Sequence, residues 1–183
     1  DENGELLHPE VQLTNQAVFA GPASTEPTYA VGGTKVAYLE GSLEDAMSGR
    51  PLPLRVHDLA TGTTITIGNA LRTFAIDPDG TRLAWVDGSG ALRIGSSAGG
   101  TSTVIDPGGD AIPFVDVDGP VVAYQRGGSF DDRDATGTFH VSVNDATGAP
   151  LGLVGRGPKV ANVNGTYWLA YQRDRDLDDM WHH

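Results

Sequence analysis

Short apolar runs separated by turn residues recur along the whole chain. Residues 54–58 and 139–143 alternate between apolar and polar side chains, and both runs end in similar turns rich in Asp, Ala, Thr and Gly. Alternation with a period of two is typical of a half-buried β-strand, and Gly, Asp and Asn favour the tight turns between strands. The pattern therefore predicts many short strands and little helix.

A fourfold repeat organises these runs. Four segments share a turn glycine, an apolar run, an alanine and an aromatic residue: 33–41 (GTKVAYLEG), 80–88 (GTRLAWVDG), 119–127 (GPVVAYQRG) and 165–173 (GTYWLAYQR). Their aromatic residues, Tyr38, Trp85, Tyr124 and Tyr171, lie 47, 39 and 47 residues apart. A period of about 40 to 50 residues is typical of β-propellers, in which each unit is a four-stranded sheet.

The runs around each aromatic predict the other strands of the unit. A first strand precedes each turn glycine, at 28–31, 73–76, 113–117 and 159–163. Third strands are predicted at 54–58, 92–94 and 139–143, and fourth strands at 63–67, 101–105 and 151–154. We therefore predict an all-β fold, a β-propeller or partial propeller of about four repeated antiparallel four-stranded sheets. An ordinary β-sandwich built from similar hairpins is the alternative.

One of the four units resembles a known family. Residues 77–85 (DPDGTRLAW) are similar to the WD40-like propeller repeats of the TolB type, in which a Pro-Asp-Gly turn leads into an apolar strand. The other units lack the Pro-Asp pair and match by spacing alone. The resemblance implies a protein-binding propeller that is secreted or located at the cell envelope. The matching residues build turns and strands, so no partner-binding residue is transferred.

The repeats divide the chain into two parts. Residues 28–183 hold the propeller repeats, and residues 1–27 form an N-terminal segment in which 10–13 and 17–19 can supply a closing strand. The fourth unit has room for only part of its sheet before Met180 and Trp181. The sequence thus predicts either a small closed propeller or an arc of a larger one. We expect a protein partner or a second copy to cover the open sheet edges of an arc, because unpaired edges invite aggregation.

Charge and composition narrow the function classes. The chain has 12 basic and 24 acidic residues, a net charge of −12, which repels nucleic-acid backbones. No apolar stretch approaches the roughly 20 residues of a membrane span. Cysteine is absent, which excludes disulfides and thiolate metal sites. We expect no nucleic-acid binding and no membrane span.

Two acidic clusters are candidates for calcium. Alternating carboxylates in a loop can converge on this hard cation, which takes six to eight oxygen ligands. The candidate ligands are Asp131, Asp132, Asp134, Asp174, Asp176 and Asp178. The cluster at Asp174, Asp176 and Asp178 does not match an EF-hand, and an acidic solvated loop is the alternative. Calcium is the one cofactor that the sequence proposes.

Nothing in the sequence predicts catalysis. The histidines have no metal-ligand spacing apart from the terminal pair, His182 and His183, and there is no nucleophile elbow or phosphate-binding loop. Trp85 and Trp168 lie within repeated strands and are predicted to be core residues. We therefore predict a non-enzymatic scaffold for protein–protein interaction. The alternatives are an accessory propeller domain of a larger enzyme, such as a serine peptidase, and a calcium-dependent ligand-binding module.

Overall fold

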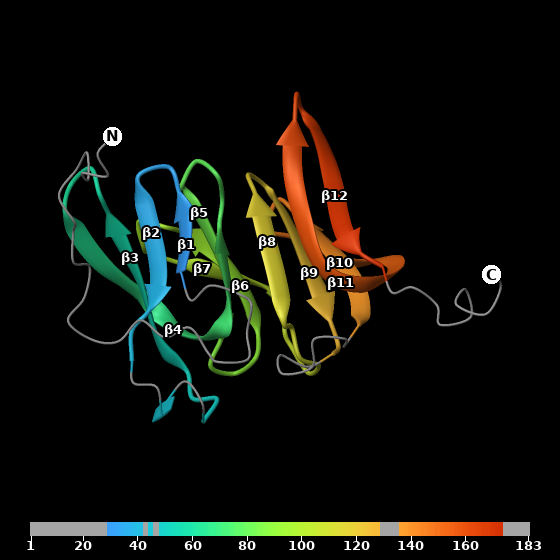
Figure 1. The fold of residues 1–183 in the computed structure, drawn as a ribbon, viewed down its shortest axis with the longest axis horizontal. Helices are drawn as coiled ribbons and strands as arrows, with labels where there is room; N and C mark the ends of the chain where they lie inside the picture. Colours follow the sequence, from blue (N-terminus) through green and yellow to red (C-terminus); the bar gives the residue numbers. More distant parts are fainter. Residues whose placement is uncertain (1–28, 42–43, 46–47, 129–135, 174–183) are drawn as a thin grey trace, which may run out of the picture.

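The computed structural model describes residues 29–41, 44–45, 48–128 and 136–173. In this part of the chain the fold is all-β and antiparallel, with seven strands in one sheet and five in another (Figure 1). The first sheet holds β1 (Tyr29–Gly32), β2 (Lys35–Leu39), β3 (Leu52–Asp58), β4 (Thr63–Ile76), β5 (Arg82–Asp87), β6 (Leu92–Ser96) and β7 (Ser102–Asp106). The second holds β8 (Phe114–Asp118), β9 (Val121–Arg126), β10 (Gly137–Val143), β11 (Ala149–Val163) and β12 (Thr166–Gln172).

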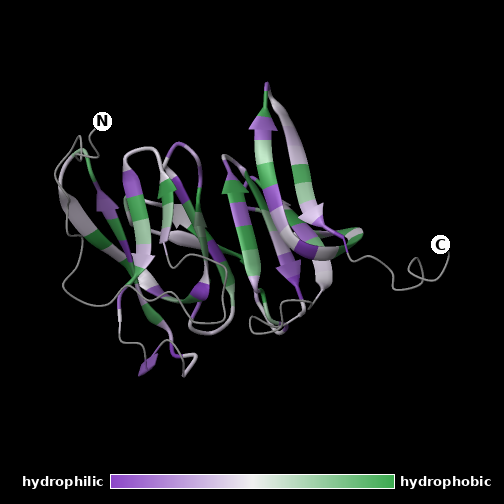
Figure 2. Ribbon diagram, viewed as in Figure 1, coloured by the Kyte–Doolittle hydropathy of each residue, from purple (hydrophilic) through white to green (hydrophobic). Residues whose placement is uncertain are grey.

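The strands form where the sequence alternates. In β3, Leu54 and Val56 are buried on one face while Arg55 between them is only partly buried on the other. Hydrophobic and hydrophilic residues alternate in the same way along several strands in Figure 2. Alternation places every second side chain in the core, which is why the strand positions were predictable.

The number of sheets differs from the prediction of four. β4 pairs with β3 up to Ala70, where it also begins to pair with β5, and β11 pairs with β10 up to Gly155 and with β12 from Arg156 onward. Each of these two long strands therefore runs through the border between two repeats. A fourth strand and the next first strand that were expected to be separate are one continuous strand, so two sheets form instead of four.

The repeat persists within the two sheets as four units of paired strands. We number the units along the chain, and each long strand contributes its first half to one unit and its second half to the next. The first unit is β1 to β3 with the first half of β4, and the second is the rest of β4 with β5 to β7. The third is β8 to β10 with the first half of β11. The fourth, called the terminal hairpin below, is residues 157–163 of β11 with β12.

Successive units pack face to face. One buried cluster joins Ala37 of the first unit to Leu83 and Trp85 of the second. A second cluster joins Ala84 of the second unit to Tyr124 of the third. A third joins the third unit to the terminal hairpin. It contains Val121, Ala123, Val160 and, partly buried, Leu169. The core thus lies between the units.

The Pro-Asp-Gly turn between β4 and β5 has the geometry that its sequence predicts. Gly80 has φ of +77°, a conformation that glycine adopts without strain. The Asp77 carboxylate accepts hydrogen bonds from the Arg82 amide at 2.9 Å and the Thr81 hydroxyl at 3.1 Å. The Gly33 amide donates to the Pro78 carbonyl at 2.9 Å, so this turn also contacts the turn of the first unit.

Candidate interaction surface

Each hairpin between the first two strands of a unit carries the repeated alanine and aromatic residue on opposite faces of its strand. In the first three units both residues are buried, because the alanine faces the next unit and the aromatic residue lies on the other face. The alanines Ala37, Ala84 and Ala123 have no exposed surface. A small residue at this position lets the following sheet approach closely.

The terminal hairpin has the same local structure. Asn164 and Gly165 form its turn, with φ of 53° and 83°, and Val163 pairs directly with Thr166. Two consecutive residues with positive φ are typical of a type I′ turn, which the Asn-Gly sequence favours. The pattern that builds the earlier hairpins therefore builds this one as well.

The outer face of the terminal hairpin differs from its counterparts because no later unit covers it among the described residues. Trp168 is 64% exposed and Val163 is 52% exposed. Residues directly opposite in an antiparallel pair point to the same face of the sheet, as do residues two positions apart on one strand. Trp168 pairs with Ala161, and Val163 is two residues after Ala161, so these three side chains share one face. Ala170, two residues beyond Trp168, is exposed where the other three repeated alanines are buried. We call Ala161, Val163, Trp168 and Ala170 the outer face.

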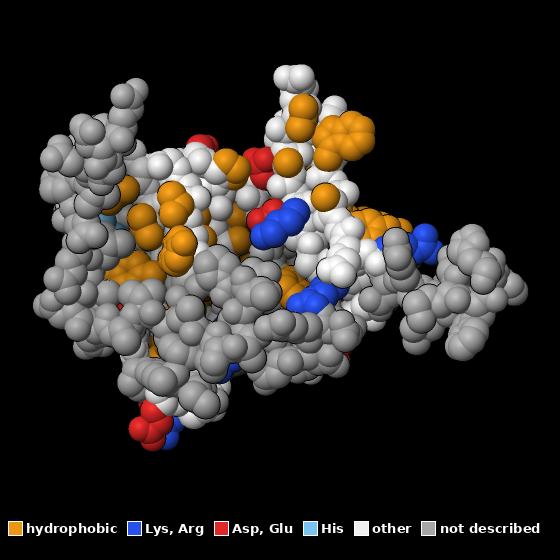
Figure 3. Space-filling model, in the orientation of Figure 1, with side chains coloured by type: hydrophobic (Ala, Val, Ile, Leu, Met, Phe, Trp, Pro, Cys, Tyr) orange, Lys and Arg blue, Asp and Glu red, His pale blue; other side chains and the backbone are white. Residues whose placement is uncertain are grey.

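The prediction that both strand tryptophans are core residues is therefore correct for Trp85 and wrong for Trp168. Trp85 is 4% exposed because the first unit packs against it. Trp168 points away from the third unit, and none of the strands that the structure describes follows to cover it. Figure 3 shows hydrophobic side chains at the projecting end of the terminal hairpin.

A groove borders β12 on the side of the third unit. Its volume is about 470 Å³, and it is lined by Thr136, Gly152, Leu153, Val154, Gly155, Tyr171 and Arg173. Tyr171 is partly buried there, with its ring 4.9 Å from the Phe139 ring in an edge-on contact. β12 is the last strand of its sheet and pairs only with β11 in the described part of the chain. The groove thus lies beside a strand edge with unpaired backbone groups.

In the third unit, Tyr124 occupies the position that corresponds to Tyr171 of the terminal hairpin. Its hydroxyl donates to Asp106 at 2.8 Å, and its ring stacks on His140 of β10 at 5.3 Å. Burial, with the neighbouring Asp106 carboxylate, raises the pKa of Tyr124 well above its ordinary value of 10.0. This tyrosine therefore stays neutral and holds the second sheet against the end of β7.

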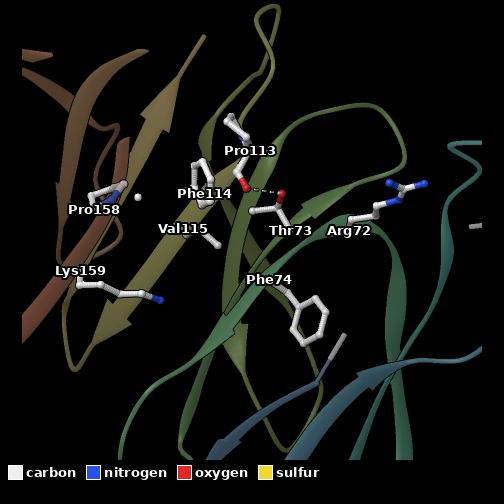
Figure 4. Close-up of a pocket in the computed structure, with 9 residues that line it drawn as sticks. Arg72, Thr73, Phe74, Pro113, Phe114, Val115, Pro158 and Lys159 are labelled. Atoms are coloured by element: carbon white, nitrogen blue, oxygen red, sulfur yellow. Dashed lines mark hydrogen bonds between the residues drawn. The ribbon is translucent and has the colours of Figure 1, made fainter. Parts of the chain in front are cut away.

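The seam between the two sheets contains a small cavity (Figure 4). Its volume is about 30 Å³, room for about one water molecule. The Thr73 hydroxyl donates to the Pro113 carbonyl at 3.2 Å across one side. Lys159 points toward it, and Arg72 points away. A site of this size holds no organic ligand.

Asp116 is a partly buried carboxylate of β8, the strand whose residues Phe114 and Val115 line this cavity. Burial raises its pKa, and the opposing influences are the Lys159 ammonium group at 3.6 Å and a hydrogen bond from the Val160 amide at 2.8 Å. These contacts fasten β11 to β8 and explain the carboxylate as a structural group.

The predicted calcium ligands lie outside the described residues. Asp131, Asp132 and Asp134 fall in 129–135, and Asp174, Asp176 and Asp178 fall in 174–183. Within the described ranges, no group of three or more His, Asp or Glu side chains is placed to hold a metal ion. Among these residues there is also no helix of the length and apolar character needed to cross a membrane.

The histidines that the structure describes have structural surroundings. His57 is buried with Nδ1 2.8 Å from the Thr64 hydroxyl, and His140 stacks on Tyr124. His140 Nε2 also lies 3.5 Å from the Thr138 hydroxyl. His8, His182 and His183 are outside the described part of the chain.

Comparison with known proteins leaves the family open. No family model and no curated protein matches the chain. A solved structure titled "Crystal structure of Nidogen/Laminin Complex" is similar to it with a TM-score of 0.49 and 11% identity. The match covers 78% of this chain and 54% of that one, so the chain spans about half the length of that structure. The resemblance to TolB-type repeats remains a prediction.

Two sequence signals for this surface were missed. Residues 123–126 and 170–173 have the identical sequence Ala-Tyr-Gln-Arg, although the first copy is largely buried and the second lies at the sheet edge. The third strands also share a triplet with a large apolar, a basic or imidazole and a β-branched residue: 54–56 (LRV), 92–94 (LRI) and 139–141 (FHV). Both signals require knowledge of which strands pair, which the sequence alone did not provide.

Proposed function

We propose that this chain is part of a β-propeller-type scaffold that binds another protein through the outer face of its terminal hairpin. The observation that carries the proposal is the 64% exposure of Trp168 on a face whose counterparts in the other three units are covered. Contiguous exposed apolar surface at the end of a β-structure is typical of an interaction site.

The stacking of the units supports the propeller-type architecture. Each repeated alanine of the first three units faces the following unit, and each aromatic residue of the later units lies on the face toward the preceding one. A propeller repeats this relation around a ring. The terminal hairpin carries the same residues but offers its outer face to another chain.

The scaffold is proposed to be non-enzymatic and to act outside the cytoplasm. The absence of a catalytic motif in the sequence favours a binding role, and the resemblance to TolB-type repeats favours a secreted or cell-envelope location. The partner is a protein rather than a nucleic acid, because the net charge of −12 opposes polyanions.

The proposal is tested by light scattering and by binding of an apolar-surface dye. We expect the chain to bind the dye and to self-associate as its concentration rises, and the double substitution Trp168→Ala with Val163→Ala to reduce both. Leu59→Ala is the matched control, because Leu59 is also exposed but lies in the turn between β3 and β4. A monomer at high concentration that binds no dye would overturn the proposal.

A further inference from the structure

In each of the first three units, a third strand pairs with the strand that carries the alanine and the aromatic residue. The residue opposite the aromatic is Arg55 for Tyr38, Arg93 for Trp85 and His140 for Tyr124. The residue opposite the alanine is β-branched in all three cases, namely Val56, Ile94 and Val141. The third strand therefore follows one rule: apolar, then basic or imidazole, then β-branched.

In the described part of the chain, the terminal hairpin has the second strand of this arrangement without the third. β12 ends its sheet in the described part of the chain (Figure 1). The groove of about 470 Å³ lies beside it. Tyr171 of β12 and Arg173, the residue after the end of β12, line this groove on one side, and Leu153 and Val154 line it from the third unit. An added strand would complete the backbone pairing of β12 and place alternate side chains against an apolar wall.

We propose that the edge of β12 binds an extended segment of a partner protein with the sequence pattern Phe-His-Val, paired antiparallel as β10 is with β9. This inference rests on the proposed scaffold function and names the chemistry of its partner. The histidine would lie opposite Tyr171, the valine opposite Ala170 and the phenylalanine opposite Gln172.

The third-strand residue opposite the aromatic residue is arginine in two units and histidine in one. The charge of the residue two positions after the aromatic residue determines which of the two fits. In the first two units this residue is acidic and pairs with the third-strand arginine: Glu40 contacts Arg55 at 2.8 Å, and Asp87 contacts Arg93. In the third unit it is Arg126, and the third strand has His140 instead. An arginine on the third strand would face a like charge there, which destabilises the pairing.

In the terminal hairpin, as in the third unit, the residue two positions after the aromatic residue is an arginine. Arg173 follows Tyr171 at the same spacing as Arg126 follows Tyr124, within the identical sequence Ala-Tyr-Gln-Arg. The segment that fits is therefore similar to β10, and a segment similar to β3 or β6 is disfavoured.

The probe for this proposal is a labelled peptide with the sequence of residues 137–143 (GTFHVSV), titrated with the purified chain and followed by fluorescence anisotropy. We expect saturable binding. Methylation of the backbone nitrogens that face β12 should weaken binding by about tenfold or more, which corresponds to about 1.4 kcal/mol. Equal binding of the methylated peptide would overturn strand addition.

The charge rule is tested with a second peptide in which His is replaced by Arg (GTFRVSV). The wild-type chain should prefer the histidine peptide. Arg173→Glu should reverse the preference, because the new glutamate could pair with the peptide arginine as Glu40 pairs with Arg55. Arg173 is exposed, so the substitution should leave folding intact. Unchanged preference in R173E would contradict the proposed register.

Two further results separate this inference from the scaffold proposal. Leu59→Ala, in the turn between β3 and β4, should not affect peptide binding. If the chain binds the dye through Trp168 but binds neither peptide, the strand-addition proposal fails and the scaffold proposal stands. If the chain forms dimers that no peptide dissociates, the occupant is a second copy, and the proposed partner segment is wrong.

Discussion

The sequence Ala-Tyr-Gln-Arg occurs in two different surroundings in this protein. In β9, Ala123, Tyr124 and Gln125 have no exposed surface, because β8 and β10 flank the strand and neighbouring units cover both faces. In β12, Ala170 and Gln172 are exposed and Tyr171 is partly buried, because only β11 pairs with the strand. The comparison shows that burial in a repeat protein depends on the neighbouring units more than on the local sequence.

The largest expected contrast comes from removing the two tyrosine side chains. Tyr124→Ala should lower the free energy of unfolding by about 3 to 5 kcal/mol, the range for large aromatic residues in a packed core. Tyr171→Ala should cost about 1 kcal/mol, because its ring is only partly buried. Urea denaturation of both variants measures the difference. Similar losses would mean that β12 is covered as fully as β9.

The two alanines should tolerate a larger side chain unequally. Ala123→Leu inserts atoms between the third unit and the terminal hairpin and should cost about 1 to 3 kcal/mol. Ala170→Leu adds them to the outer face and should change stability by less than about 0.5 kcal/mol. The check is the shift in urea midpoint for each variant. An equally damaging Ala170→Leu would indicate that a neighbour already covers this face.

Alkaline pH should destabilise the fold through Tyr124. The folded state raises the pKa of Tyr124 above 10.0, so this group binds its proton more tightly when folded than when unfolded. Its contribution to stability is fully present below about pH 10 and is lost as pH rises toward the folded pKa. Tyr124→Phe should flatten this decline. The measurement is the free energy of unfolding between pH 8 and the onset of alkaline unfolding, in steps.

The smallest expected effect is that of Trp168→Ala on stability. The side chain is mostly exposed, so its removal should change the free energy of unfolding by less than about 0.5 kcal/mol. The same substitution should lower dye binding clearly. A large loss of stability would show that Trp168 packs within the folded chain.

Sequence reasoning found the strands because alternation, turn glycines and the repeated aromatic residues are local signals. It placed Trp85 in the core for the same reason. It failed for Trp168 because the burial of a strand residue depends on whether another sheet follows, and no local pattern records this. It also predicted four sheets, since nothing in residues 63–76 or 149–163 marks a strand that continues from one unit to the next.

Hydrogen exchange of the two strands tests the central claim most directly. The amides of residues 121–126 and 166–172 are compared in the same chain by mass spectrometry. We predict that those of β12 exchange about 100-fold faster, equivalent to about 2.8 kcal/mol at 1.4 kcal/mol per tenfold, because only one edge of this strand is paired among the described residues. Equal protection of β9 and β12 in the isolated chain would show that the terminal hairpin is already completed and would contradict the account.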